Sequence, residues 1–513
     1  MSRKSPPARA RFVLASALGA ACALAAACGG SASPAAQPVG AGPGNARRPP
    51  RVAAAPPWTS PRLAHAQLDN GLELQLLQRH AAPLLELRLV VLSGTASDGE
   101  HPGVAALTAA ALRPSAPGRA ASREPLERAE QLGARWQLET TRDATTISVS
   151  LPRAGLAEGL ALLGSFSVAP RLGDRELELL RRRELARVNQ LLADDASWTA
   201  SMALYAELFR ASPRHHPYEH FDALPADLER ASAGDCGAWY ARNFSPRNAR
   251  LVAVGDLNLE QLLPLAQRAL GSWQGGQPDA PLFFTPPAPD RVHTLLVDHP
   301  GAASVELRLA MLGPERQDPA WAQLALLAEL LDRNGAEALE RLGEADRQLG
   351  ARLEEVAHGA TPLLLSARIA LQQAPQALAA LLETLSALAA RPPEERALRA
   401  AAEQLSGRVL LGLESGAGAA DLLSRAASAG LRESAFDEFR AELARIHPAQ
   451  LHSAARRYLK APPIVVMVGD AQRLVTPLRR FGQVHVSSAA RNLQVERVLS
   501  QDPSAAGEAP AGP

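Results

Sequence analysis

The central part of this 513-residue chain contains one pattern twice, and that repeat limits the folds open to it. Residues 85–92 (LELRLVVL) correspond to residues 305–312 (VELRLAML), and both runs alternate between apolar and polar side chains as a half-buried strand does. Residues 251–256 (LVAVGD) correspond to residues 464–470 (IVVMVGD), where a strand again leads into a Gly-Asp turn. Because both landmarks recur in the same order, the sequence indicates two copies of one structural unit.

The repeat also predicts the domain organisation. We expect two homologous domains, residues 62–275 and 290–482, joined by a proline-rich linker over residues 276–289. In the first domain, strand and helix patterns occur in blocks, which predicts an α+β fold with helices packed on a mostly antiparallel sheet. We also expect the strands at 72–78 and 84–92 to pair as a hairpin.

Both ends of the chain differ in composition from its centre. Residues 1–28 begin with positive charges, continue with a short apolar run and end in small residues, which is typical of a signal peptide. The stretch before Cys28 resembles a bacterial lipobox whose leucine lies one position early, so we expect lipidation at Cys28, with Cys22 as the second candidate and cleavage without a lipid as the alternative. Residues 29–61 are predicted as a disordered Pro/Ala/Gly tether and residues 483–513 as a disordered tail.

Charge and cysteine content exclude several kinds of protein. The chain carries 54 Lys and Arg against 53 Asp and Glu, a net charge of +1, which argues against a general nucleic-acid binder. Cys236 is the only cysteine beyond the predicted signal peptide, so it has no intramolecular disulfide partner there and is most simply a small buried side chain. No glycine-rich phosphate loop and no Gly-x-Ser-x-Gly motif stands out, so phosphate-loop and serine-hydrolase chemistry have no support.

The stretch from Gly103 to Leu112 is predicted to form a helix without chemical groups. Alanine and leucine favour a helix, and Pro114 ends the run. Positions 106, 109 and 110 share one helix face, at the spacing on which two metal ligands and a base could converge. All three are alanine, and a methyl group can neither coordinate a metal nor move a proton. If this helix lines a site, that site lacks catalytic side chains.

Taken in order, these landmarks resemble the pitrilysin/insulinase family of zinc metallopeptidases, whose signature is an inverted zinc motif, His-x-x-Glu-His. The resemblance covers both halves of the chain. Each short motif is unspecific alone, but the motifs together, in this order and spacing, are specific. It rests on LDNGL at 68–72, Gly94 and Gly103-Val104-Ala105, LGA at 132–134, TTRDAT at 140–145, HPY at 216–218, and WYARNFSPRNA at 239–249 leading into VGD at 254–256.

The resemblance implies where zinc chemistry would lie. In this family the two histidines and the catalytic glutamate follow the Gly-x-Ala on the first helix. Register then assigns Ala106 and Ala110 to the histidine positions and Ala109 to the glutamate. The resemblance therefore identifies a member that lacks the zinc motif, with no cofactor expected.

Two further contributions of the family also look absent. A third ligand, a glutamate, comes from a long downstream helix, and the matching place falls near Val188 or Asn189. Glu184 lies one turn away, but we expect it on a solvated helix face beside neighbouring arginines. The second half of active members supplies an arginine and a tyrosine that bind substrate, in a stretch like Arg-x-x-x-Gly-x-x-Tyr; here Gly350-Ala351-Arg352-Leu353 has leucine at the tyrosine place.

One literal match to the zinc motif lies elsewhere, at residues 216–220 (HPYEH). Read functionally, His216 and His220 would hold zinc and Glu219 would act as the base on a zinc-bound water. Read structurally, it is the family's His-Pro-Tyr loop followed by two coincidental residues. Because Pro217 disfavours helical angles at the residue before it, the two histidines would not share a continuous helical turn, which favours the structural interpretation.

The resemblance implies a catalytically inactive lipoprotein that serves as a scaffold or peptide-binding subunit. We expect it to form a heterodimer with an active zinc peptidase of the same family and to contact extended peptides, but not nucleic acid. Its lipid anchor would hold it in the cell envelope, facing the periplasm and attached to the outer membrane. Two alternatives stay open: an active zinc metalloendopeptidase that uses His216, Glu219 and His220, and a stand-alone peptide-binding lipoprotein.

Overall fold

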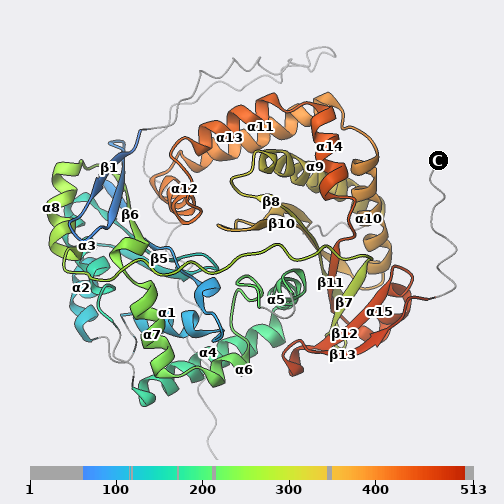
Figure 1. The fold of residues 1–513 in the computed structure, drawn as a ribbon, viewed down its shortest axis with the longest axis horizontal. Helices are drawn as coiled ribbons and strands as arrows, with labels where there is room; N and C mark the ends of the chain where they lie inside the picture. The colour runs from blue at the N-terminus through green and yellow to red at the C-terminus, as the bar shows by residue number, and fades with distance from the viewer. Residues whose placement is uncertain are drawn as a thin grey trace, which may run out of the picture. The chain divides into compact units, whose positions relative to one another are not determined.

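The computed structural model describes residues 62–114, 116, 120–169, 173–210, 215–343 and 349–502 (Figure 1). The predicted signal peptide, the predicted lipidation site Cys28 and the predicted tether lie outside these residues. These described residues form one compact unit. Among the described residues, no helix has both the length and the apolar character needed to cross a membrane.

The first half builds a six-stranded sheet in the order β1-β2-β6-β3-β5-β4. Only β2 and β6 pair in parallel; the other neighbours are antiparallel. Alternate apolar side chains of the strands, such as Leu85, Leu87 and Leu89, are fully buried in the core. The strands are β1 Ala64–Gln67, β2 Glu73–Gln78, β3 Leu84–Val91, β4 Arg135–Thr140, β5 Thr145–Pro152 and β6 Ala249–Gly255.

The predicted hairpin between residues 72–78 and 84–92 is wrong, because β6 lies between β2 and β3. Residues 251–254 of β6 are fully buried, and a strand covered on both faces is stabilised when both of its edges are also paired. The turn at Asn70-Gly71 instead connects β1 to β2. Gly71 adopts a positive φ of 92°, and the Asn70 side chain accepts a hydrogen bond from the Leu72 amide at 3.2 Å.

Helices cover the first sheet and position the alanine-rich segment. Its helix, α1 (Val104–Leu112), follows Gly103, whose φ is 91°. Asp98 caps the helix by accepting hydrogen bonds from the amides of Gly103 and Ala105, both at 2.8 Å. The other helices are α2 Ala120–Gln131, α3 Leu156–Ser165, α4 Asp174–Asp194, α5 Ala196–Leu208, α6 Pro225–Arg230, α7 Ala233–Asn243 and α8 Leu259–Leu270, with short 3-10 helices at Thr95–Ser97, Arg153–Gly155 and Pro246–Asn248.

The second half repeats the first sheet and extends it. Its seven strands lie in the order β13-β12-β7-β11-β8-β10-β9. The parallel pair β7–β11 corresponds to β2–β6, and the antiparallel run β11-β8-β10-β9 corresponds to β6-β3-β5-β4. The α+β fold with two homologous domains is therefore confirmed. The strands are β7 His293–Asp298, β8 Ser304–Glu315, β9 Gly350–Leu353, β10 Ala360–Ala370, β11 Ile464–Gly469, β12 Gln483–Ser488 and β13 Val495–Leu499.

The prediction of a disordered tail from residue 483 is wrong for its first part. β12 pairs in parallel with β7, and β13 pairs with β12. Val484 and Val486 alternate with more exposed side chains and are buried against the second core, which the composition-based prediction overlooked. The Ala-, Gly- and Pro-rich end of the chain, residues 503–513, lies outside the described part.

The two halves exchange helices. α5 of the first half packs on β8 and β11 of the second sheet, and α12 (Gly416–Ser428) of the second half packs on β3 and β6 of the first. Apolar residues of both halves consequently share one hydrophobic core. The remaining helices are α9 Ala320–Arg341, α10 Ala374–Ala390, α11 Glu395–Gly412, α13 Ala435–Arg445, α14 Pro448–Tyr458 and α15 Ala471–Leu478, with a 3-10 helix at Ala489–Arg491.

Candidate functional site

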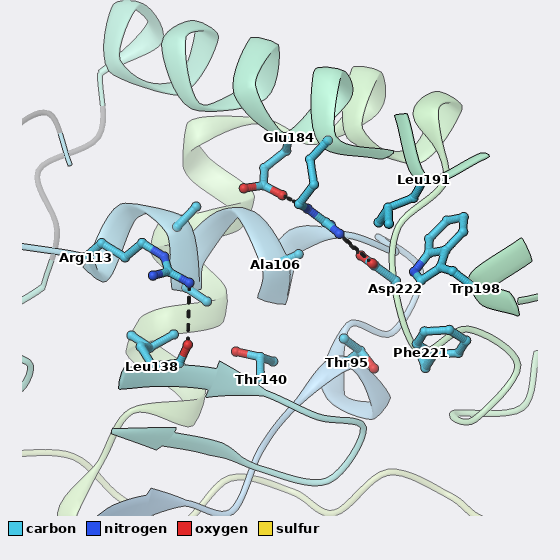
Figure 2. Close-up of a pocket in the computed structure, with 13 residues that line it drawn as sticks. Thr95, Ala106, Arg113, Leu138, Thr140, Glu184, Leu191, Trp198, Phe221 and Asp222 are labelled. Carbon is cyan, nitrogen blue, oxygen red and sulfur yellow. Dashed lines mark hydrogen bonds and ion pairs between the residues drawn. The ribbon is translucent and has the colours of Figure 1, made fainter. Parts of the chain in front are cut away.

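The alanine face of α1 lines a cavity of about 450 Å³ in the first half (Figure 2). Ala106, Ala109 and Ala110 all contribute to its wall, as their shared helix face predicts. The volume falls within the range of about 300–1,000 Å³ that is usual for ligand pockets. The other lining residues are Thr95, Arg113, Leu138, Thr140, Glu184, Arg187, Leu191, Trp198, Phe221 and Asp222.

Opposite the alanines, an arginine joins two carboxylates. Arg187 donates from Nε to Glu184 at 2.7 Å, and its two terminal nitrogens bind the two oxygens of Asp222 at 2.9 and 2.8 Å. In Figure 2, dashed lines from Glu184 and from Asp222 mark these bonds to the arginine. The bidentate geometry with Asp222 is the strong, directional form of an arginine–carboxylate pair.

The position of Glu184 corrects the sequence interpretation. We expected it on a solvated face, but its side chain is only 18% exposed and lines the cavity. Glu184, Arg187 and Leu191 share one face of α4 at helical spacing, so all three meet the cavity. Val188, expected near the third-ligand place, is fully buried in the core, and Asn189 is exposed.

The charges of this cavity balance without a metal ion. Burial lowers the pKa of Arg187, but its hydrogen bonds and ion pairs with Asp222 and Glu184 raise that pKa above its usual value. The guanidinium therefore stays positive and is shared by both carboxylates, and Arg113, which also lines the cavity, supplies the second positive charge. Three methyl groups and two engaged carboxylates do not form a zinc ligand set, which requires free nitrogen, sulfur or oxygen donors. Among the described residues, no group of three or more His, Cys, Asp or Glu side chains could hold a metal ion.

The histidine of the literal motif is a packed structural residue. His216 is 4% exposed, and its ring stacks on Phe209 with centroids 4.5 Å apart. Its Nδ1 accepts a hydrogen bond from the Tyr218 amide at 3.0 Å, so Nε2 carries the proton and donates to the Phe284 carbonyl at 2.9 Å. Burial lowers the pKa of His216, which keeps the ring neutral. Both ring nitrogens are engaged, and neither offers a lone pair to zinc.

The rest of that motif does not converge on a site. Residues 215–220 form a turn, in which the Glu219 amide binds the His216 carbonyl at 3.0 Å, and not a helix. Glu219 contacts the neighbouring His215 at 3.2 Å, and Nδ1 of His220 is buried without a hydrogen-bond partner in the described part of the chain. Pro217 accounts for the turn, because it excludes helical angles at the preceding residue.

The second half supplies no substrate-binding tyrosine at the predicted place. Arg352 and Leu353 lie on β9 at the edge of the second sheet. Arg352 is 58% exposed and pairs with Glu354 at 2.7 Å. Its guanidinium thus supports an internal carboxylate.

Sequence reasoning missed a buried polar cluster that joins the two halves. Arg142, in the turn between β4 and β5, lies 3.2 Å from Glu354 and stacks over the Tyr205 ring at 4.1 Å. The Tyr205 hydroxyl donates to Glu354 at 2.7 Å. Burial raises the pKa of Glu354, but Arg142 and Arg352 outweigh it and hold that pKa below its usual range. The TTRDAT motif, which contains Arg142, was the one sequence signal for this cluster. The motif does not reveal that Glu354 of the second half is the partner of Arg142.

The neighbouring Asp143 extends this cluster. Its carboxylate accepts hydrogen bonds from the Tyr218 hydroxyl and from the Ala357 amide, the latter at 3.0 Å. The Tyr218 oxygen in turn accepts the His358 amide at 3.0 Å. The loop that carries HPY therefore connects the halves, and its tyrosine has an explicit structural role.

The chain was compared with protein-family models and with curated protein sequences. Residues 231–405 match the family model described as the peptidase M16 inactive domain. No curated protein sequence matches the chain.

Solved structures with the same fold come from several bacteria. A peptidase M16 inactive domain from Pseudomonas fluorescens is 20% identical and has a TM-score of 0.68, covering 80% of this chain and 98% of that one. A protease from Helicobacter pylori is 18% identical with a TM-score of 0.68, covering 80% of this chain and 99% of that one. The first half of the periplasmic protease PqqL from Escherichia coli is 17% identical with a TM-score of 0.64, covering 81% and 93%.

Proposed function

We propose that this chain, which matches the M16 inactive-domain model over residues 231–405 and shares the fold of M16 structures, is a non-catalytic subunit of the pitrilysin/insulinase family. In this proposal it builds part of a peptide-binding chamber, while a zinc-bearing member of the same family supplies the metal and the base. A lipid on Cys28 holds the chain to the outer membrane, facing the periplasm.

The observation that carries the proposal is the cavity wall. At the positions where the family places two zinc ligands and the catalytic base, Ala106, Ala109 and Ala110 present methyl groups to the cavity. The acidic residue on the facing helix, Glu184, is bound to Arg187 at 2.7 Å. Losing one essential catalytic group already lowers a rate by roughly 10⁴-fold or more, so the loss of three leaves no metal chemistry at this place.

The shape that remains suits peptide binding. Leu138 and Thr140 of β4 line the cavity, and β4 is the last strand of its sheet. An extended peptide can add to such an edge through main-chain hydrogen bonds. Trp198 and Phe221, whose ring centroids are 6.3 Å apart, add an aromatic wall that can pack against a peptide side chain.

The proposed location in the cell envelope is supported by the sequence and by one similar solved structure. The predicted lipobox at Cys28 argues for a lipid anchor, and the similar Escherichia coli structure belongs to a periplasmic protease. Several acyl chains on one cysteine would anchor the chain durably, since each buried methylene contributes about 0.8 kcal/mol.

Reconstitution with a partner tests the proposal. The chain starting at residue 29 is mixed with an M16 peptidase of the same organism that carries an intact His-x-x-Glu-His, and cleavage of an unstructured peptide is followed. We expect no cleavage by this chain alone and an increase when the two are mixed. An unchanged partner rate, with no complex on size-exclusion chromatography, would contradict the subunit role and favour the stand-alone lipoprotein.

A further inference from the structure

A second cavity, of about 430 Å³, lies in the C-terminal half. Its lining residues come from the segment between β8 and α9, the start of α9, and α13 with the segment before it. They are Arg316, Gln317, Asp318, Pro319, Trp321, Ala322, Gly430, Leu431, Arg432, Ala435, Glu438, Phe439 and Glu442.

Arg316 is the chemically distinctive residue of this cavity. Its guanidinium carbon lies 3.7 Å from the centroid of the Trp321 ring and 5.9 Å from that of Phe439. The two rings meet edge to face, with centroids 5.2 Å apart. Among the described residues, Arg316 forms no ion pair and no hydrogen bond, so its stacking face is used while its donor edge is free.

Partial burial strengthens the attraction between the free edge of this guanidinium and an anion. Arg316 is half-buried, and burial lowers its pKa, with the more distant Glu355 opposing this. An arginine remains protonated even so, and a partly desolvated cation gains more from an anionic partner than a hydrated one does. Nε1 of Trp321 is buried and has no acceptor in the described part of the chain.

The other charges of the cavity limit the ligand to a single negative charge. Arg432 neutralises Glu438 at 3.1 Å, and Asp318 accepts the Ala320 amide at 2.8 Å. Glu442 and Asp318 leave the rim slightly acidic, which disfavours phosphates and polyanions but tolerates one carboxylate bound at Arg316. The aromatic pair beside that position offers an apolar surface for the group that carries the carboxylate.

We propose that this cavity is a second peptide-binding site that recognises a C-terminal carboxylate. The carboxylate pairs with the free edge of Arg316, and the last side chain of the peptide packs on Trp321 and Phe439. This assignment does not depend on the zinc positions or on the proposed partner.

Calorimetric titration with the tripeptide Ala-Ala-Leu tests the proposal on the chain starting at residue 29. We expect the free acid to bind and its C-terminal amide to bind about tenfold more weakly or worse, because a charged hydrogen bond is lost. Arg316→Gln should weaken the acid by a similar factor. Arg399→Gln, which removes an exposed arginine of α11 outside the cavity, should leave binding unchanged.

Several results would overturn the assignment. The first is that the free acid and the amide bind equally tightly. The second is that Arg316→Gln binds the free acid as tightly as the wild-type chain does. The third is that the wild-type chain does not bind the free acid at about 1 mM. Acetate or free leucine binding as tightly as the tripeptide would replace the peptide site by one for small carboxylates. The comparison of acid with amide uses only wild-type protein, so it decides the matter even if the Arg316 variant does not fold.

Discussion

The Tyr205 hydroxyl lies 2.7 Å from a carboxylate oxygen of Glu354, and this hydrogen bond joins a helix of the first half to the segment that follows β9 in the second. The same carboxylate accepts Arg142, whose guanidinium covers the Tyr205 ring. Three side chains from separate parts of the sequence thus form one buried polar contact. The fold here depends on both halves together, as the exchange of α5 and α12 also indicates.

Removing the Tyr205 hydroxyl should destabilise the protein measurably. Tyr205→Phe keeps the ring under Arg142 but deletes a hydrogen bond to a charged acceptor, for which we expect a loss of about 1–3 kcal/mol in the free energy of unfolding. Urea denaturation followed by circular dichroism measures it. Tyr458→Phe serves as the control, because that buried hydroxyl has no hydrogen-bond partner among the described residues. Equal losses in both variants would refute the assigned role.

Replacing the carboxylate should cost more and should depend on pH. Glu354→Gln leaves Arg142, which is 13% exposed, without its counter-ion, so we expect a loss of about 3 kcal/mol near neutral pH. Because Arg142 and Arg352 lower the folded-state pKa of Glu354, the carboxylate stabilises the fold above its unfolded pKa, and this contribution disappears as pH falls through the folded-state value. Unfolding measured between pH 3 and 7 should show the two proteins converging at the acid end. A difference that stays constant with pH would exclude an electrostatic origin.

The arginine of the alanine-lined cavity should matter for stability. Arg187→Met leaves Glu184 and Asp222, which are 18% and 14% exposed, without a cation, and we expect a loss of about 1–3 kcal/mol. Arg182→Met on the same helix removes a side chain that is 72% exposed and should change stability by at most about 0.5 kcal/mol. Similar values for the two variants would show that the Arg187 network contributes little.

The single thiol of the described chain should be inert in the folded state. Cys236 is fully buried, and burial raises the pKa of its thiol to about 11. Because the thiolate is the reactive form, Ellman's reagent at pH 8 should react only as the protein unfolds. Rapid stoichiometric labelling of native protein would contradict the burial of this side chain.

Local patterns predicted much of the fold. The alternation in residues 85–92 identified strand β3, and the alanine run identified α1. The strand order was not predictable, because β6 enters between β2 and β3 from more than a hundred residues downstream and no local pattern carries that pairing. The tail was misjudged because β12 and β13 are short and lie beside a stretch of low complexity.

The candidate site was predicted in part. The three alanines do line a cavity, as their shared face required. On the facing helix, Val188 is buried in the core, whereas Arg187, one residue and a rotation of about 100° away, lies at the cavity wall. Asp222 lies in a loop, and only the tertiary structure brings it to Arg187.

The zinc content of the chain starting at residue 29 tests the central claim most directly. After dialysis against trace zinc, we expect near-zero zinc per wild-type chain. The variant Ala106→His/Ala109→Glu/Ala110→His/Arg187→Met restores the motif and frees Glu184, so it should retain zinc under the same conditions. About one tightly held zinc per wild-type chain would contradict a non-catalytic cavity.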